Sequence, residues 1–173
     1  MHKQAISMRS QVVAMSVVLL GAQTFALESD RSQDVRWSAD GNSSMMMKDG
    51  LRILELSDNV EVTQGSLFIQ GDEAVFEYDA TTNELNRVTV QGSPVRYQQQ
   101  LDEDGGMVVG TSETLSFYTD EIDGETIVEL QGNANIESPD STMKCSTITY
   151  LADQDLIREA AGPCEGLLNS TNN

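Results

Sequence analysis

Two cysteines, Cys145 and Cys164, are the most reactive side chains in this 173-residue sequence. A thiolate can act as a nucleophile beside a base, bind zinc together with other ligands, or pair with a second thiol. Neither a base nor a complete set of zinc ligands accompanies this pair, so in an oxidising compartment we predict a disulfide. Two buried free thiols are the alternative. If the chain reverses near Gln154-Asp155, the two cysteines lie directly opposite each other on neighbouring strands.

Carboxylates and one histidine are the other groups that could act as acids, bases or metal ligands. His2 is the only histidine, and it lies in a segment that we expect to be removed, which excludes histidine-dependent triads and metal sites. The acidic runs at 102–104 and 120–125 lack the spacing of an EF-hand loop, which favours solvated turns. The sequence therefore predicts no enzyme and no metal site.

The first 26 residues have the three parts of a secretory signal peptide. Lys3 and Arg9 supply positive charge, an apolar stretch follows at 12–22, and small residues precede the expected cleavage after Ala26. A membrane anchor is the alternative, but the stretch has 11 residues, whereas a membrane-spanning helix needs about 20. We therefore expect an exported chain.

Removal of this segment would leave a strongly acidic protein. The whole chain has 28 acidic and 10 basic residues, a net charge of −18, and loss of two cations leaves 28 against 8, or −20. Such a charge repels nucleic acid and anionic head groups over long distances. An anionic lipid would therefore have to be bound through its apolar part.

Apolar and polar residues alternate along most of the remaining chain. Val60-Glu-Val62, Ala74-Val-Phe76-Glu-Tyr78 and Ile148-Thr-Tyr150 are examples, and a period of two predicts β-strands with one apolar face. Turn signals separate the expected strands. They are Gln64-Gly65, Gly71-Asp72, Gln91-Gly92, Gly105-Gly106, Asp123-Gly124, Gln131-Gly132 and Ser138-Pro139-Asp140.

A repeat of about 30 to 40 residues organises these strands. Units that begin at Val60, Val95 and Ala134 each contain a short strand, a turn, a longer strand, a polar turn and a returning strand, and a partial unit at 35–59 precedes them. Because such a unit cannot bury its apolar face alone, the units must stack. We predict an all-β fold, a β-jellyroll of stacked, bent antiparallel hairpins that is open at both ends. Its exposed end strands can pair with another chain.

The order and spacing of several short motifs resemble those of the LptA-like (OstA N-terminal domain) family. The similarity covers about residues 35–162. The motifs are Trp37-Ser-Ala-Asp40, Asn59-Val-Glu-Val-Thr-Gln-Gly65, Leu67-Phe-Ile69, Gly71-Asp-Glu-Ala-Val-Phe-Glu-Tyr78, Gly92-Ser-Pro-Val95, Gly132-Asn-Ala-Asn-Ile136 and Ser146-Thr-Ile-Thr-Tyr150.

The resemblance implies a periplasmic carrier of lipopolysaccharide with no cofactor of its own. It also implies a bridge of jellyrolls, joined edge to edge, between an LptC-like inner-membrane partner and an LptD-like outer-membrane partner. We accordingly expect a cleaved signal peptide at 1–26, a jellyroll domain at 27–163 and a polar, disordered tail at 164–173. The strong acidity is not a requirement of the family.

The inward-facing apolar residues are the candidate lipid-binding site. An ordinary core is the alternative for each of them, because cores have the same period of two. The set is Val35, Trp37, Val60, Val62, Leu67, Ile69, Phe76, Tyr78, Leu85, Val88, Val90, Val95, Tyr97, Leu115 and Phe117.

Two other functions remain open from the sequence. The first is an LptC-like, membrane-anchored subunit of the same pathway, which a mature N-terminus at Leu27 would exclude. The second is a purely structural β-solenoid with a dry core, which would retain no glycolipid. The sequence does not rank Arg36, Arg52, Arg87, Arg96, Lys48 and Lys144 as contacts for lipid phosphates.

Overall fold

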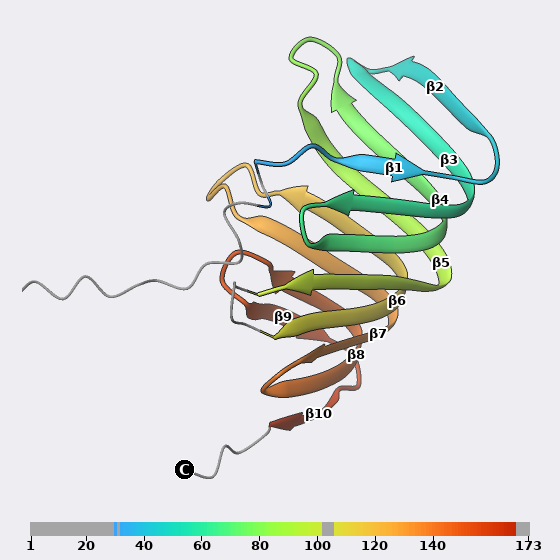
Figure 1. Cartoon of the computed structure of the whole chain (residues 1–173). Helices are drawn as coiled ribbons and strands as arrows, with labels where there is room; N and C mark the ends of the chain where they lie inside the picture. Colours follow the sequence, from blue (N-terminus) through green and yellow to red (C-terminus); the bar gives the residue numbers. More distant parts are fainter. Residues whose placement is uncertain (1–29, 31, 102–105, 169–173) are drawn as a thin grey trace, which may run out of the picture.

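A computed structural model describes residues 30, 32–101 and 106–168 as one antiparallel sheet of ten strands (Figure 1). Eight strands follow one another in the order β1-β3-β4-β5-β6-β7-β8-β10, while β2 pairs with β3 and β9 pairs with β8. The all-β jellyroll prediction is confirmed. The strands are β1 Arg36–Ser38, β2 Ser43–Lys48, β3 Leu51–Gln64, β4 Leu67–Asp79, β5 Leu85–Gln100, β6 Met107–Thr119, β7 Thr126–Ser138, β8 Ser141–Leu151, β9 Leu156–Ala161 and β10 Glu165–Leu168.

The long strands bend near their middles, and the bends are in register. The pairing shifts between Ser57 and Val60 in β3, between Gln91 and Val95 in β5, and between Gln131 and Ala134 in β7. Such irregularities bend a strand and increase its local twist. The sheet therefore folds over along one side (Figure 1). Its two halves are the β2/β9 layer, which carries those two short strands, and the β1/β10 layer.

Glycine is required where the folded sheet is most crowded. A Cβ atom on Gly71 would lie 2.5 Å from the Val90 Cγ1 atom and 2.7 Å from the Gln91 carbonyl oxygen. Gly132 has a φ of 77°, in the left-handed region that favours glycine. Gly71-Asp72, Gln91-Gly92 and Gln131-Gly132 were predicted as turns between strands. The structure instead places them at bends within continuous strands, because glycine serves both purposes.

Both ends of the stack finish in short strands. β1 and β2 pair with the two halves of β3, and β9 and β10 pair with the two halves of β8. Within the described residues, no strand pairs with the outer edges of these four strands. The prediction of a fold open at both ends is therefore confirmed.

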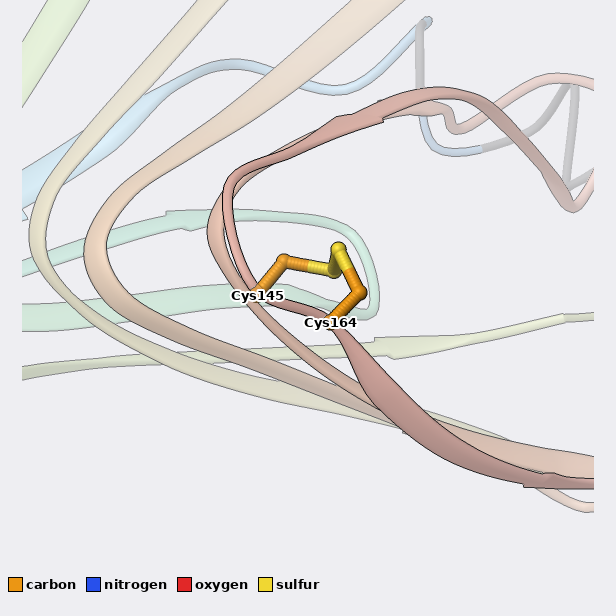
Figure 2. Close-up of a disulfide and its surroundings, with 2 residues drawn as sticks. All are labelled: Cys145 and Cys164. Carbon is orange, nitrogen blue, oxygen red and sulfur yellow. A yellow bond between two sulfur atoms is a disulfide. The ribbon is translucent and has the colours of Figure 1, made fainter.

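The predicted disulfide joins Cys145 to Cys164 at the bend of the last strand pair (Figure 2). The two Cα atoms are 4.3 Å apart, and the sequence separation is 19. Cys145 is in β8, and Cys164 directly precedes β10, whose residue Glu165 pairs with Lys144. The cysteines are thus opposite each other, as the expected chain reversal implied. The bridge fixes the corner between β9 and β10 against β8.

The end of the chain differs from the predicted disordered tail. That tail was expected to begin at Cys164, but 165–168 form β10 along β8. Residues 169–173, the predicted signal peptide at 1–26 and the acidic run 102–104 lie outside the described residues. Of the residues that are described, none belongs to a helix with the length and apolarity needed to cross a membrane.

Replacement of both cysteines, Cys145→Ser with Cys164→Ser, should lower the free energy of unfolding by about 3 kcal/mol, because the open loop gains entropy in the unfolded chain. Urea denaturation of the two proteins measures the difference. Wild-type protein in reductant is the control and should unfold at the midpoint of the double variant. Equal midpoints for all three samples, or two reactive thiols in unfolded wild type without reductant, would contradict the assignment.

Candidate functional site

The register of the sheet aligns apolar side chains in rows across the strands. One row in the β2/β9 layer runs Leu54, Phe76, Val88, Phe117, Val128 and Tyr150, each residue paired directly with the next. Directly paired residues in an antiparallel ladder point to the same face. Members of this row are buried or half-buried, so the row lines the space between the two layers.

The candidate residues predicted from the sequence come together in this interior. Trp37 is paired with the buried Val62 and therefore shares its face, but Trp37 is 44% exposed because β1 is an end strand. Val35, Tyr78, Leu85 and Phe117 are half-buried against the core cluster. The remaining ten are buried within it: Val60, Val62, Leu67, Ile69, Phe76, Val88, Val90, Val95, Tyr97 and Leu115.

The prediction omitted the C-terminal half of the interior. Val128, Leu130, Ile148 and Tyr150 show the same alternation as the predicted set and could have been found by it. Alanine and cysteine gave a weaker signal, because their small side chains mark an apolar face less clearly than large ones do. The further buried members of the cluster are Leu54, Leu56, Ala74, Val108, Ala134, Ile136, Cys145 and Ala152.

A group of polar side chains reaches this apolar interior: Tyr97, Tyr150 and Gln99 are buried, and Asp155 is exposed. Tyr97 is in the β1/β10 layer and Tyr150 is in the β2/β9 layer, and their rings meet edge to face with centroids 6.4 Å apart. The Tyr97 hydroxyl donates a hydrogen bond to Gln99 Oε1 at 2.7 Å, and the Tyr150 hydroxyl donates to Asp155 Oδ1 at 2.8 Å. Burial raises the pKa of both tyrosines, and the nearby Asp155 carboxylate raises each pKa further.

The two layers separate into a cavity of about 460 Å³ at the C-terminal end of the stack. Tyr150, Asp155 and Ile157 line it from the β2/β9 layer, while Ile136 and Met143 line it from the β1/β10 layer. Leu156, Leu167 and Leu168 form its exposed rim. Ser138, Ser141 and Thr142 also line it from the β1/β10 layer. This end of the interior is thus open, apolar at its rim and polar on both walls.

The opposite end of the interior carries a different apolar rim. Met45 pairs with the buried Leu54 and therefore faces the interior, as does Met47 two residues later. Both side chains are exposed, as is Trp37 on the other layer. Methionine is flexible and adapts to irregular apolar surfaces. Both openings therefore offer apolar contact to a ligand that enters or leaves.

Acidic residues occupy the outer face. Glu61 lies between inward Val60 and Val62, and Glu129 lies between inward Val128 and Leu130, so both acids point away from the interior.

Two of the acids at 120–125 make contacts within the protein. Arg158 Nη1 lies 3.6 Å from Asp120 Oδ2 and 3.9 Å from Asp123 Oδ2, and both carboxylates also accept backbone hydrogen bonds. The described residues contain no group of three or more ligands suited to a metal ion.

Two of the candidate phosphate contacts already have partners within the protein. The Arg87 guanidinium stacks 3.9 Å from the centroid of the Tyr118 ring, and Lys144 Nζ lies 3.8 Å from Glu165 Oε1. Both contacts are on the outer surface, where the exposed Lys144–Glu165 ion pair contributes little to stability.

Sequence comparisons identify relatives over most of the chain. The family model described as "LptA/(LptD N-terminal domain) LPS transport protein" matches residues 39–155. The lipopolysaccharide export system protein LptA of Haemophilus influenzae is 31% identical over 136 residues, which are 78% of this chain and 74% of that protein. LptA of Escherichia coli K12 is 27% identical over 147 residues, which are 85% of this chain and 75% of that protein.

The fold also matches a solved structure. The crystal structure of LptH from Pseudomonas aeruginosa, titled the LptA homologous periplasmic component of the conserved lipopolysaccharide transport device, superposes with a TM-score of 0.65. The match covers 82% of this chain and 99% of that chain at 21% sequence identity. At this identity the likeness supports the fold alone.

The tyrosine pair makes stability depend on pH in the alkaline range. The unfolded chain loses phenolic protons near pH 10, whereas burial keeps Tyr97 and Tyr150 neutral in the folded protein. Their stabilisation is therefore complete below about pH 10 and is lost as the pH rises above it. Ultraviolet titration should show that these two phenols ionise only with unfolding, and Tyr97→Phe should make the loss of stability shallower. Reversible ionisation of all four tyrosines in folded protein would contradict this.

Proposed function

The chain belongs to the LptA/LptD N-terminal-domain family of lipopolysaccharide transport proteins, and from this premise we propose that it carries lipopolysaccharide with the acyl chains between its two layers. The observation that supports this proposal is the continuous row of apolar side chains, which ends in the open cavity beside Tyr150. Candidate contacts are the fifteen residues predicted from the sequence, together with Leu130, Ile136 and Ile148.

Apolar burial supplies the affinity in this proposal. Removal of an acyl chain from water contributes about 0.8 kcal/mol per methylene. A chain of ordinary length is therefore captured against the net charge of −20 that the exported protein would carry (28 acids against 8 cations). The acids on the outer face, such as Glu61 and Glu129, keep their charges away from the bound chain. Charged sugar and phosphate groups of the lipid would then stay outside in solvent.

For transport of this kind, the protein does not need to make or break any covalent bond. The lipid leaves when a downstream site binds it at least as tightly, or when further lipid arrives from upstream. We therefore place this chain outside the enzymes and assign it no cofactor.

The interior is closely packed, so acyl chains can enter it only if the two layers separate. Val60, Phe76 and Leu115 are fully buried, and such close packing also favours the alternative of a structural solenoid with a dry core. For acyl chains to reach these residues, the two layers must part along the side opposite the bends. The C-terminal cavity is the place where that separation already exists.

The end strands support a role in assembly. β1 and β2 at one end, and β9 and β10 at the other, present edges that can pair with a strand of another chain. We propose that these edges join copies end to end, with the N-terminal edge toward an LptC-like partner and the C-terminal edge toward an LptD-like partner. The periplasm is the proposed location, reached through cleavage of a signal peptide at 1–26. An anchored, LptC-like subunit would instead keep that segment.

Photo-cross-linking at inward positions tests acyl binding. A benzoyl-phenylalanine group at Phe76 or Leu115 should yield a lipopolysaccharide adduct in cells, because both side chains face the interior. The matched control is Glu77, which is adjacent to Phe76 but points outward and should give none. Adducts at Glu77 alone, or at no inward position, would contradict the carrier function.

A further inference from the structure

The Cys145–Cys164 disulfide joins a buried sulfur to an accessible one. Cys145 is 6% exposed and belongs to the core cluster, whereas Cys164 is an exposed residue at the corner before β10 (Figure 2). A thiolate exchanges with a disulfide only if it can reach one of the two sulfurs. Cys164 is therefore the half of the bridge that an external thiol can attack.

A cavity of about 570 Å³ on the outer face leads to this bridge, and both cysteines line it. Its walls include Asn135 and Lys144, which are paired with each other. They face away from the interior, because Asn135 lies between the inward residues Ala134 and Ile136. A volume of this size is typical of sites for small molecules.

The same cavity is polar without an excess of either charge. Thr111, Asn133 and Ser146 add hydroxyl and amide groups to its lining. The Lys144 cation is offset by the Glu165 carboxylate, since Nζ and Oε1 lie 3.8 Å apart. The cavity therefore fits a polar thiol that carries little net charge.

Little besides the bridge holds β10 on β8. Four residue pairs form the ladder, from Glu165 with Lys144 to Leu168 with Ser141. All four β10 residues are exposed, including Leu167 at 72% and Leu168 at 87%, so the strand buries little apolar surface. The last residues of a domain stay ordered only when they are tied down. Opening of the bridge should therefore release β10 from β8.

Loss of β10 makes the C-terminal end of the stack uneven. β9 and β10 both pair with β8, and at the opposite end β1 and β2 both pair with β3. The two layers thus end at the same step, so both can join a second copy at once. Without β10, one layer ends a strand short, or about 4.8 Å, and cannot meet the second copy when the other layer does.

We propose that Cys164 is a site of thiol–disulfide exchange that controls the C-terminal edge. The thiolate of an external thiol attacks Cys164 Sγ, a bond forms between these two sulfurs, and the Cys145–Cys164 bond breaks. Its electron pair leaves on Cys145 Sγ, which takes a proton from water. A second thiol then attacks the mixed disulfide, so that two thiols are oxidised to one external disulfide and both cysteines are reduced. This inference rests on the end-to-end assembly of the proposed function, to which it adds regulation.

Mass spectrometry identifies the sulfur that is attacked. Purified exported protein is treated with a limiting amount of 2-mercaptoethanol, a small neutral thiol, and quenched with N-ethylmaleimide. Peptide mapping should find the mercaptoethanol adduct on Cys164 and the maleimide on Cys145. An adduct on Cys145 instead, or exchange that occurs only in urea-unfolded protein, overturns the assigned site.

Hydrogen exchange shows whether β10 leaves β8. Reduction should raise the exchange rate of amides at 165–168 by about ten-fold or more, because their ladder opens. Peptides from the middle of the sheet, such as 95–100, should keep their rates. Unchanged exchange at 165–168 after reduction overturns the inference and leaves the proposed function intact.

Analytical ultracentrifugation over a range of protein concentrations measures the effect on assembly. Reduction should weaken self-association about ten-fold or more, because only one layer can still join. Gly166→Val should do the same with the bridge intact, since its Cβ would lie 2.8 Å from the Thr142 carbonyl oxygen and push β10 away. Leu167→Val is the matched control, an exposed position of the same strand, and should associate like oxidised wild type.

The other outcomes reject different statements. Association that is as strong in reduced wild type or Gly166→Val as in oxidised wild type overturns the inference alone. If oxidised wild type does not associate at any concentration, the proposed end-to-end assembly fails and the inference fails with it. Acyl binding is judged separately, by cross-linking at Phe76.

Discussion

The in-register bends of the long strands are the constraint on which the rest of this structure depends. One sheet has one apolar face, and that face can leave water only when the sheet folds onto itself. The bends at Gln91–Val95 and Gln131–Ala134 place the two layers opposite each other. Close approach at the folded side requires Gly71. The enclosed interior, its two openings and the end strands all follow from this folding.

Alternation predicted the strands and many of the inward residues, because side chains two positions apart on a strand share a face. Val60, Phe76 and Leu115 were identified in this way. Alternation missed twelve of the 22 buried members of the core cluster. Gln91-Gly92 was misread as a turn because a bend within a strand and a turn between strands have the same composition. The contact of Tyr97 with Tyr150 joins two layers whose approach depends on every bend between them, so no local pattern could predict it.

The charge distribution and the disulfide fit a protein that binds hydrocarbon and leaves polar groups in solvent. Acids such as Glu129 alternate with inward residues and thereby cover the outer face, which explains how a chain with a net charge of −18 can hold an apolar interior. The Cys145–Cys164 bridge secures the last strand at its bend. That strand is both a wall of the C-terminal cavity and an edge available to a partner.

The central claim is that the interior holds acyl chains rather than a dry core. Native mass spectrometry of the protein after gentle extraction from cells tests this claim most directly, because a carrier retains its ligand where a packed solenoid does not. We expect a species whose mass exceeds that of the polypeptide by one glycolipid, and collisional activation should release the lipid. Only the bare polypeptide mass, in repeated extractions, would contradict the account.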